Sequence, residues 1–143
     1  MRSTAAKIAA GLAIVFLMAA AYLVRSCVIP QRTAQGEVGL RFARALVAGE
    51  FELAHQMLEP KLAATYSPEK LGATYQEMVS YGGEPPTDVR VVGVLDYWPA
   101  KQPGDVGWAY VAISGRSFSE AVTVTVTRQG ERALIREIEW GRP

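Results

Sequence analysis

The sequence contains one cysteine and one histidine, and these two scarcities exclude several classes of site. The single Cys27 forms no disulfide within the chain and supports no multi-cysteine zinc site. His55 has acidic neighbours along its predicted helix, but no residue is identifiable that would orient it as a general base. The sequence therefore predicts no metal and no cofactor, and it predicts that His55 is a surface or satisfied core residue.

Excess positive charge is also missing. The chain has 15 Lys and Arg against 14 Asp and Glu. When Arg2, Lys7 and Arg25 around the N-terminal apolar run are set aside, the rest of the chain is mildly acidic and has no basic stripe. Nucleic-acid binding needs clustered Lys and Arg that release counterions from the phosphates. The glycines in "SGRS" and "YGGE" do not lie between a strand and a helix, so no phosphate loop is predicted either.

One long apolar run is present, from Ile8 to Val24, without a charged residue. As a helix this run is about 25 Å long, slightly short of the roughly 30 Å hydrocarbon core of a bilayer. Neighbouring apolar residues extend it, and Lys7 and Arg25 are able to reach the two interfaces. We therefore expect residues 5–26 to form one helix that holds the chain in a bacterial cell membrane. A short N-terminal tail of this kind stays in the cytoplasm, which leaves the rest of the chain outside.

Two alternatives to this anchor stay open. The segment "MAAA" offers small residues in the arrangement at which a signal peptide is cleaved. The segment Val24-Arg25-Ser26-Cys27 resembles a bacterial lipobox, although Arg25 stands where a small or apolar residue is expected. In the anchor interpretation Cys27 is a spectator thiol. The chain then divides into a membrane segment at 1–27, a linker at 28–36 and one domain at 37–143.

Helical periodicity dominates the first half of this domain. A four-residue spacing of apolar side chains predicts a helix over 37–48, with Gly49 as its end. "EFELAHQML" predicts a short second helix that ends at Pro60 and turns Leu53, Met57 and Leu58 inward, and "KLAATY" a helical turn. "SPEK" marks the start of a third helix, with Ser67 as N-cap, which ends at "GG".

Beyond Pro86 the period of the apolar residues changes from 3.6 to 2. Four segments alternate as strands do, with Gly93 at an expected bulge: "TDVRVVGVLDYW", "VGWAYVAIS", "SFSEAVTVTVT" and "RALIREIEW". The sequence therefore predicts an α+β domain in which three helices pack on a curved antiparallel sheet of about four strands.

Two short turns predict the register of the last three strands. "SGRS" suits a two-residue turn with Ser114 opposite Ser117, and "TRQGE" a three-residue turn with Gly130 in the left-handed conformation. This register places Phe118 beside Trp140. It gives a face that meets the helices: Ala109, Val111, Ile113, Phe118, Val122, Val124, Val126, Leu134, Ile138 and Trp140. The other face carries Trp108, Tyr110, Ala112, Ala121, Thr123, Thr125, Ile135, Glu137 and Glu139.

Candidate binding residues lie on both faces. Glu120 and Arg136 fall diagonally to each other on the helix-covered face near Trp140, where charged groups must pair, reach solvent at the rim or meet a ligand. They predict either a rim ion pair or a polar spot in a ligand pocket. On the other face, Trp108 and Tyr110 are either ordinary half-exposed aromatics or the anchors of a protein interface.

The helical half also resembles a known superfamily. "RFARALVAGEFELAHQMLEPKLAATYSPEKLGATYQEMVSYGG" contains an F-x-x-A-L helix, a G-E-F-x-x-A turn and an S-P-E-x-L helix start. These resemble the nuclear transport factor 2-like superfamily, which includes SnoaL-like and ketosteroid-isomerase-like proteins. "AVTVTVTRQGERALIREIEW" resembles its closing hairpin. The resemblance covers about residues 36 to 143. It implies a cystatin-like cone with a pocket between sheet and helices, and membrane-tethered members act as assembly or accessory subunits outside the cytoplasm.

Catalytic members of that superfamily place an Asp or a His-Asp pair inside the cone with hydrogen-bonding tyrosines. No such set is matched residue by residue in this sequence. We therefore expect a non-enzymatic, membrane-tethered extracytoplasmic domain that associates with a protein partner or with a second copy of itself. The alternatives are a small isomerase- or cyclase-like enzyme that uses Glu120 and Arg136, and a carrier of a small apolar ligand in the cone.

Overall fold

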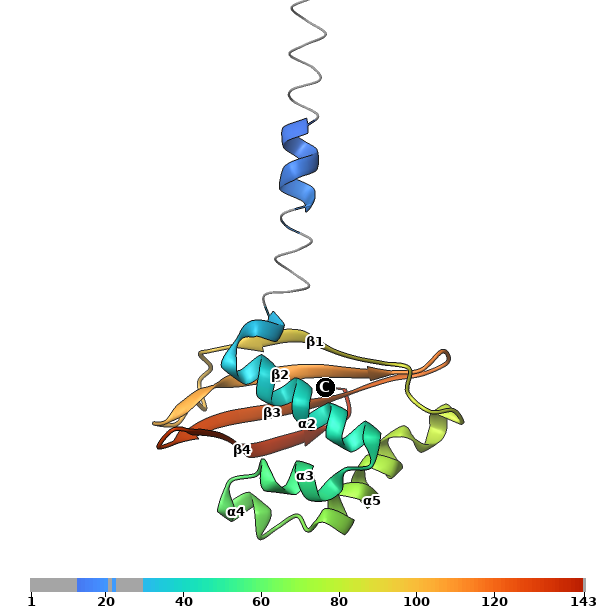
Figure 1. Cartoon of the computed structure of the whole chain (residues 1–143), viewed down its shortest axis with the longest axis vertical. Coiled ribbons are helices and arrows are strands. Elements are labelled where there is room, and N and C mark those ends of the chain that lie inside the picture. Colours follow the sequence, from blue (N-terminus) through green and yellow to red (C-terminus); the bar gives the residue numbers. More distant parts are fainter. Residues whose placement is uncertain (1–12, 21, 23–29, 143) are drawn as a thin grey trace, which may run out of the picture.

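A computed structural model describes residues 13–20, 22 and 30–142 of the chain. Residues 13–20 are helical, and all of their side chains are exposed. After a short 3-10 helix, Pro30–Arg32, come four α-helices and then four strands. The predicted α+β class, with helices first and an antiparallel four-stranded sheet after them, is confirmed (Figure 1).

The long helix α2, Ala34–Ala48, crosses the sheet and contacts all four strands (Figure 1). It begins three residues before the expected start, because the Thr33 hydroxyl caps it by accepting the Gly36 N–H at 3.1 Å. It ends as predicted at Gly49, whose φ of 73° is readily adopted only by glycine. Where α2 meets the sheet, Gly39 has no Cβ, and a Cβ there would lie 3.0 Å from that of Ala109.

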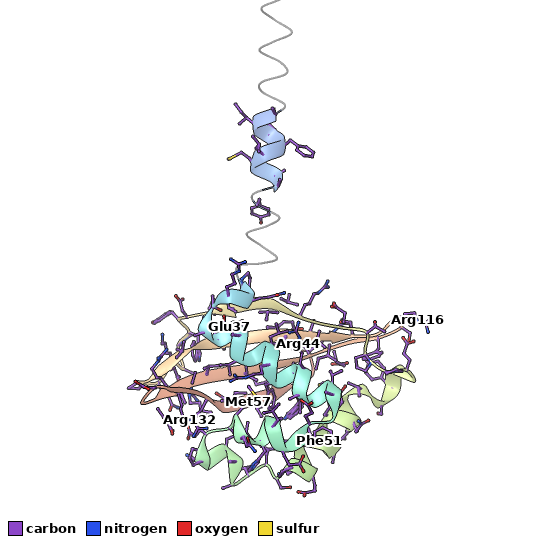
Figure 2. All side chains as sticks on the ribbon, in the orientation of Figure 1. Glu37, Arg44, Phe51, Met57, Arg116 and Arg132 are labelled. Atoms are coloured by element: carbon purple, nitrogen blue, oxygen red, sulfur yellow. The ribbon has the colours of Figure 1, made fainter. Side chains whose placement is uncertain are left out.

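Three shorter helices extend this layer beyond the end of α2: α3 (Phe51–Gln56), α4 (Pro60–Ala63) and α5 (Pro68–Val79). The predicted start of α5 is confirmed, since the Ser67 hydroxyl accepts the Lys70 N–H at 3.2 Å. Met57 and Leu58 are buried as predicted, and Figure 2 shows Met57 between these helices and the sheet. The prediction for Leu53 was wrong, because its side chain is 43% exposed.

The sheet has the strand order β1-β2-β3-β4: β1 (Asp88–Leu95), β2 (Asp105–Ser114), β3 (Ser119–Gln129) and β4 (Arg132–Trp140). The bulge expected at Gly93 is present beside it, where the pairing of β1 with β2 shifts between Val91 and Gly93. The free edge of β4 is covered in part by the chain that follows α3. There Ile135 donates its N–H to Met57 O at 2.8 Å and accepts the Glu59 N–H at 2.7 Å.

Side chains fill the space between α2 and the sheet. Phe42 and Leu46 of α2 are fully buried, and so are the strand residues that face them: Val111, Ile113, Val122, Val124, Val126 and Ile135. Alternation along β2 and β3 therefore predicted the core face of both strands. The opposite face of the sheet, which carries Trp108 and Tyr110, is called the outer face below.

The predicted register between β2 and β3 was wrong by two residues. Ser114 pairs with Ser119, not Ser117, and the connecting loop has four residues instead of two. Phe118 lies in this loop, where its ring occupies the space that a Cβ of Gly82 or of Gly115 would need. The expected contact between Phe118 and Trp140 was therefore wrong as well. A shift of two residues keeps every side chain on its face, and so the predicted faces of β3 survive the error.

The turn between β3 and β4 was also predicted one residue too long. Gln129 pairs with Arg132, and Gly130 has the predicted left-handed conformation, with φ 61°. Farther along β4 the pairing shifts between Thr125 and Val126, which makes Arg136 an extra, bulged residue. Because of this bulge Ile135 faces the core, and the prediction that Leu134 does so was wrong.

The expected membrane helix over residues 5–26 lies mostly outside the described residues. Among those that are described, no helix is long and apolar enough to cross a membrane. Several side chains at 14–18, together with Tyr22, are large, apolar and more than half exposed.

Candidate functional site

The outer face carries a groove of about 330 Å³ that none of the described helices covers. We call it the outer groove. It is lined by Trp98, Ala100, Trp108, Tyr110, Thr123, Thr125, Glu137 and Glu139. The volume lies at the lower end of the range for ligand sites, roughly 300–1,000 Å³, and suits one or two inserted side chains. As alternation along β2 predicts, Trp108 and Tyr110 lie on this face, and both are half-buried.

The strand pairing arranges most of this lining in two rows. In the first row Trp108 pairs with Thr125, and Thr125 pairs with Glu137. The second row repeats the same order of aromatic ring, hydroxyl and carboxylate, as Tyr110, Thr123 and Glu139. Neighbouring strands lie about 4.8 Å apart, so each row spans about 10 Å between the backbones of β2 and β4. The rows are two residues apart along each strand, which is about 6.7 Å.

The loop between β1 and β2 adds the remaining part of the lining. Trp98 lies in this loop, and its ring already lies near an ammonium group of the same chain, since Lys101 Nζ is 6.0 Å from the ring centroid. Lys101 Nζ also donates to the carbonyl of Asp96. An aromatic ring attracts a cation at this range through the negative charge density of its face.

A buried ion pair holds this loop against β4. Arg136 Nε donates to Asp105 Oδ1 at 2.6 Å, and Nη2 donates to Oδ2 at 2.7 Å, which is the two-point geometry that a guanidinium and a carboxylate favour. The Asp105 side chain is fully buried and that of Arg136 is 13% exposed. Asp105 also accepts the main-chain N–H of Gln102 at 2.8 Å, and Arg136 Nη1 reaches Glu137 at 3.2 Å. The pair thus ties the loop that carries Trp98 to the strand that carries the carboxylates.

The pKa values of this pair follow from its contacts. Burial by itself would raise the pKa of the Asp105 carboxyl, but the hydrogen bonds from Arg136 and from the Gln102 N–H outweigh it, and the pKa lies below its usual value. The hydrogen bonds to Asp105 raise the pKa of Arg136. Both groups are therefore charged at neutral pH.

The predicted proximity of Glu120 and Arg136 was wrong. Glu120 lies at the start of β3, opposite Ile113, and accepts the Tyr81 hydroxyl at 2.6 Å. Arg136 lies about five residue positions farther along the sheet, on the order of 17 Å away. It meets Asp105 and Glu137, which pair with Thr127 and Thr125 of the outer face. In Figure 2, Arg116 marks the end of the sheet near Glu120, and Arg132 marks the opposite end, near Arg136.

Tyr81, which binds Glu120, and Trp140 form contacts within the fold. The hydrogen bond to the Glu120 carboxylate raises the pKa of Tyr81. Trp140 pairs with Val122, and its indole N–H donates to the Tyr66 hydroxyl at 3.2 Å. Trp140 therefore faces the helices as predicted, at a place separate from the outer groove.

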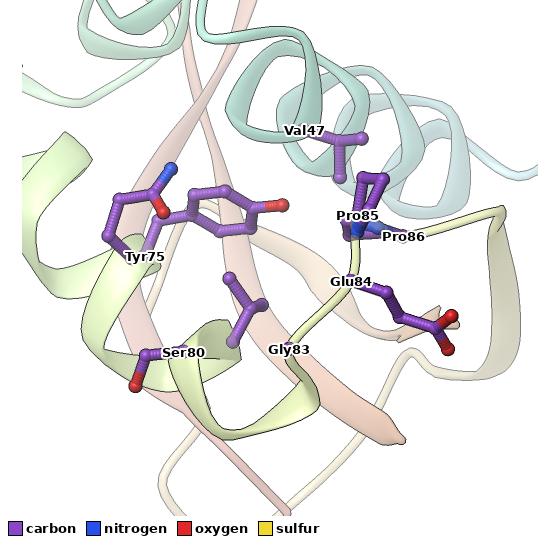
Figure 3. A pocket seen from close by; sticks show the side chains of 9 residues that line it. Val47, Tyr75, Ser80, Gly83, Glu84, Pro85 and Pro86 are labelled. Carbon is purple, nitrogen blue, oxygen red and sulfur yellow. The ribbon is translucent and has the colours of Figure 1, made fainter. Parts of the chain in front are cut away.

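A second pocket, of about 400 Å³, lies between α5, the end of α2 and the segment 83–86. Figure 3 shows the Tyr75 ring extending from α5 toward Val47 and Pro85, whereas the Glu84 carboxylate points away from it. Burial raises the pKa of Tyr75, so its hydroxyl stays protonated. The lining combines apolar residues such as Val47 and Val79 with the polar Gln76, Ser80 and Glu84. A small apolar ligand in this region of the fold stays a prediction.

Two residues of the outer groove and its support were not predicted from the sequence. Trp98 follows the first strand in a loop, where alternation assigns no face. Asp105 is the acidic residue at the start of β2, and only its contact with Arg136, 31 positions later, distinguishes it from a solvated turn residue. Comparison of the chain with protein-family models, with curated proteins and with solved structures gives no match.

Proposed function

We propose that this chain is a non-enzymatic, membrane-tethered domain of the bacterial envelope, which associates with another protein, or with a second copy of itself, through the outer face. The observation that carries the proposal is the outer groove, a hollow that no described helix covers and that is lined by two aromatic side chains of β2 and one of the β1–β2 loop. Aromatic side chains in such hollows supply much of the binding energy of protein interfaces. The resemblance to tethered accessory members of the nuclear transport factor 2-like superfamily agrees with this role.

The state of the other face supports the same proposal. The space between α2 and the sheet, where the enzyme alternative requires an open cone, is filled by buried apolar side chains. Glu120 and Arg136, which that alternative uses together, lie far apart in the sheet. The outer groove offers no oriented pair of a base and a nucleophile, but it does offer a shaped surface for recognition.

The first test is the replacement of Trp108 by alanine in the full-length chain. Truncation of an aromatic anchor costs about 2 kcal/mol or more of binding free energy in an interface. We expect Trp108→Ala to weaken association by that amount, while the domain still unfolds cooperatively. Association is measured with the chain purified from detergent-solubilised membranes, as its oligomeric state by light scattering and as rebinding of any identified partner.

Two controls accompany this experiment. Tyr97→Ala removes an aromatic side chain from the same loop region that is 74% exposed and does not line the outer groove. Glu120→Gln removes a charge on the helix-covered face. Both variants should associate as the parent does. Arg136 is unsuitable as a control, because it touches Glu137 of the outer groove. Association that is indifferent to Trp108 but lost at Glu120 would contradict the proposal.

The second test concerns the tether. If residues 5–26 anchor the chain, Cys27→Ser should leave it in the membrane fraction, because no covalent lipid is needed. Protease added to spheroplasts should digest the domain and leave a short membrane-held fragment. Loss of membrane retention in Cys27→Ser would favour the lipoprotein alternative, and a chain found wholly in the soluble cytoplasmic fraction would contradict the tether.

A further inference from the structure

Deepening the proposed function on which it rests, we infer that the outer groove binds an extended segment of a partner protein that presents lysine or arginine side chains at alternate positions. Each row of the outer groove receives one of these cationic side chains. Three properties of the outer groove favour such a segment: its charge, its hydrogen-bonding groups and its spacing.

The charge of the outer groove favours a cation. Glu137 and Glu139 stand on its β4 side, and the Glu137 side chain is 51% exposed although it also meets Arg136. Arg136 pairs with Asp105 and Glu137, and among the described residues Glu139 takes part in no ion pair. Facing these carboxylates across β3 are the rings of Trp108 and Tyr110. A cation between ring and carboxylate gains from both, because the ring face and the carboxylate are both negative.

A hydroxyl group at the floor supplies an independent indication of a ligand. Thr125 is 7% exposed, lies between Trp108 and Glu137, and lines the outer groove. Within the described part of the chain its hydroxyl has no hydrogen-bond partner. Every side-chain oxygen or nitrogen there that is shielded from solvent does have a partner, so the Thr125 hydroxyl must be in contact with solvent. The Thr125 hydroxyl therefore opens into the groove, where its oxygen is able to accept a hydrogen bond from an ammonium or guanidinium group.

The ring of Trp98 shows the same preference within the chain. Its neighbour Lys101 places an ammonium group 6.0 Å from the ring centroid. Lys101 donates to the Asp96 carbonyl within the loop, and it is not among the residues that line the outer groove. A partner cation beside Trp108 or Tyr110 would make the same kind of contact with an aromatic ring that Lys101 makes with Trp98.

The spacing of the two rows defines the shape of the segment. The rows are separated by two residues of a strand, about 6.7 Å. In an extended peptide, side chains at positions i and i+2 point to the same side and are separated by the same distance. A Lys-x-Lys segment that lies along β3 therefore places one ammonium over Thr125 and the other over Thr123. Adjacent lysines would point in opposite directions.

The test uses three synthetic peptides and the full-length chain in detergent micelles at low salt. Acetyl-Ala-Lys-Ala-Lys-Ala-amide is compared with acetyl-Ala-Lys-Lys-Ala-Ala-amide, which has the same composition, and with the first peptide carrying acetylated lysines. We expect the alternating peptide to bind about fivefold more tightly than the adjacent one, because one more ion pair forms. The acetylated peptide should not bind, and added salt should weaken binding. Binding is followed by tryptophan fluorescence and by calorimetry.

Matched variants locate the site. Glu137→Gln combined with Glu139→Gln should weaken binding of the alternating peptide about tenfold. Glu131→Gln lies in the exposed β3–β4 turn, outside the groove, and should bind as the parent does. Thermal melts of each variant show whether it is folded. Equal binding of the three peptides, or no effect of the Gln variants, would overturn the inference.

The same variants separate this inference from the proposed function. If protein association falls with Trp108→Ala but not with the two Gln replacements, the outer face is an interface and the cationic partner is wrong. If association is also indifferent to Trp108, the proposed function itself fails. If both sets of variants weaken association and the alternating peptide competes with the partner, both proposals stand.

Discussion

Replacing Val124 with aspartate should unfold the domain. Val124 is fully buried between α2 and the sheet, beside Ala109 of β2 and Ile138 of β4. An aspartate there has no cationic or hydrogen-bonding partner among these apolar neighbours. Burial of an unpaired charge costs several kcal/mol even when the group becomes protonated instead. Because the whole stability of a domain is only about 5–15 kcal/mol, a cost of this size abolishes the cooperative transition or lowers its midpoint severely.

Circular dichroism during urea and thermal unfolding measures this effect. The matched control is Val92→Asp at the bulge of β1, where the side chain is 52% exposed and the same change should stay within about 0.5 kcal/mol. Val124→Ala removes volume without adding charge and should cost about 2 kcal/mol. If Val124→Asp melts as the parent does, the assignment of the two sheet faces is wrong.

The faces of β2 and β3 were predictable because they depend on a local pattern. Alternation with period two places Val122, Val124 and Val126 on one side whatever strand lies next to them. The same pattern brought Trp108 and Tyr110 to the outer face. Helix α5 was predictable for a similar reason, since its cap at Ser67 acts within three residues.

The loop and the bulge were not predictable, because distant contacts decide them. The four-residue loop after β2 is held by Glu84, whose carboxylate accepts the Ser117 N–H at 2.9 Å and whose pKa is lowered by this bond. The Phe118 ring packs against Gly82, where a side chain larger than hydrogen would collide with it. A two-residue turn would satisfy the local sequence equally well. In the same way, the sequence around Arg136 contains no sign of a bulge, and its partner Asp105 lies in another hairpin.

The second large effect concerns this pair: Arg136→Met should destabilise the domain by about 3–5 kcal/mol. Removal of one partner of a buried ion pair leaves the other charge in a poorly solvated site, and it is this remaining charge that makes the loss so large. Here the remaining charge is that of Asp105, whose side chain is fully buried. The loop that carries Trp98 should also lose its attachment to β4, so the outer groove should change with it.

A second replacement tests whether the buried charge is the cause. Asp105→Asn in the Arg136→Met background removes that charge, while its side-chain oxygen is still able to accept the Gln102 N–H. The double variant should therefore recover part of the lost free energy of unfolding, although it lacks both charges of the pair. If the losses of unfolding free energy from the two replacements simply add, the effect of Arg136→Met arises from lost packing of the long Arg136 side chain and not from an unpaired carboxylate.

The pH dependence of unfolding should differ in sign between the parent and Arg136→Met. In the parent the pKa of Asp105 lies below its usual value of 3.8, so the unfolded chain binds the proton more readily than the folded one. The contribution of the pair is then complete above about pH 4 and is lost as the pH falls through the lower, folded pKa. In Arg136→Met, burial without a cation raises the pKa of Asp105, and protonation relieves the unpaired charge. The difference in unfolding free energy between the two proteins should therefore shrink as the pH is lowered from 7 to 4, measured by urea unfolding at each pH. A difference that is constant over this range would show that Asp105 carries no unpaired charge in the variant, and the electrostatic account of this contact would then be wrong.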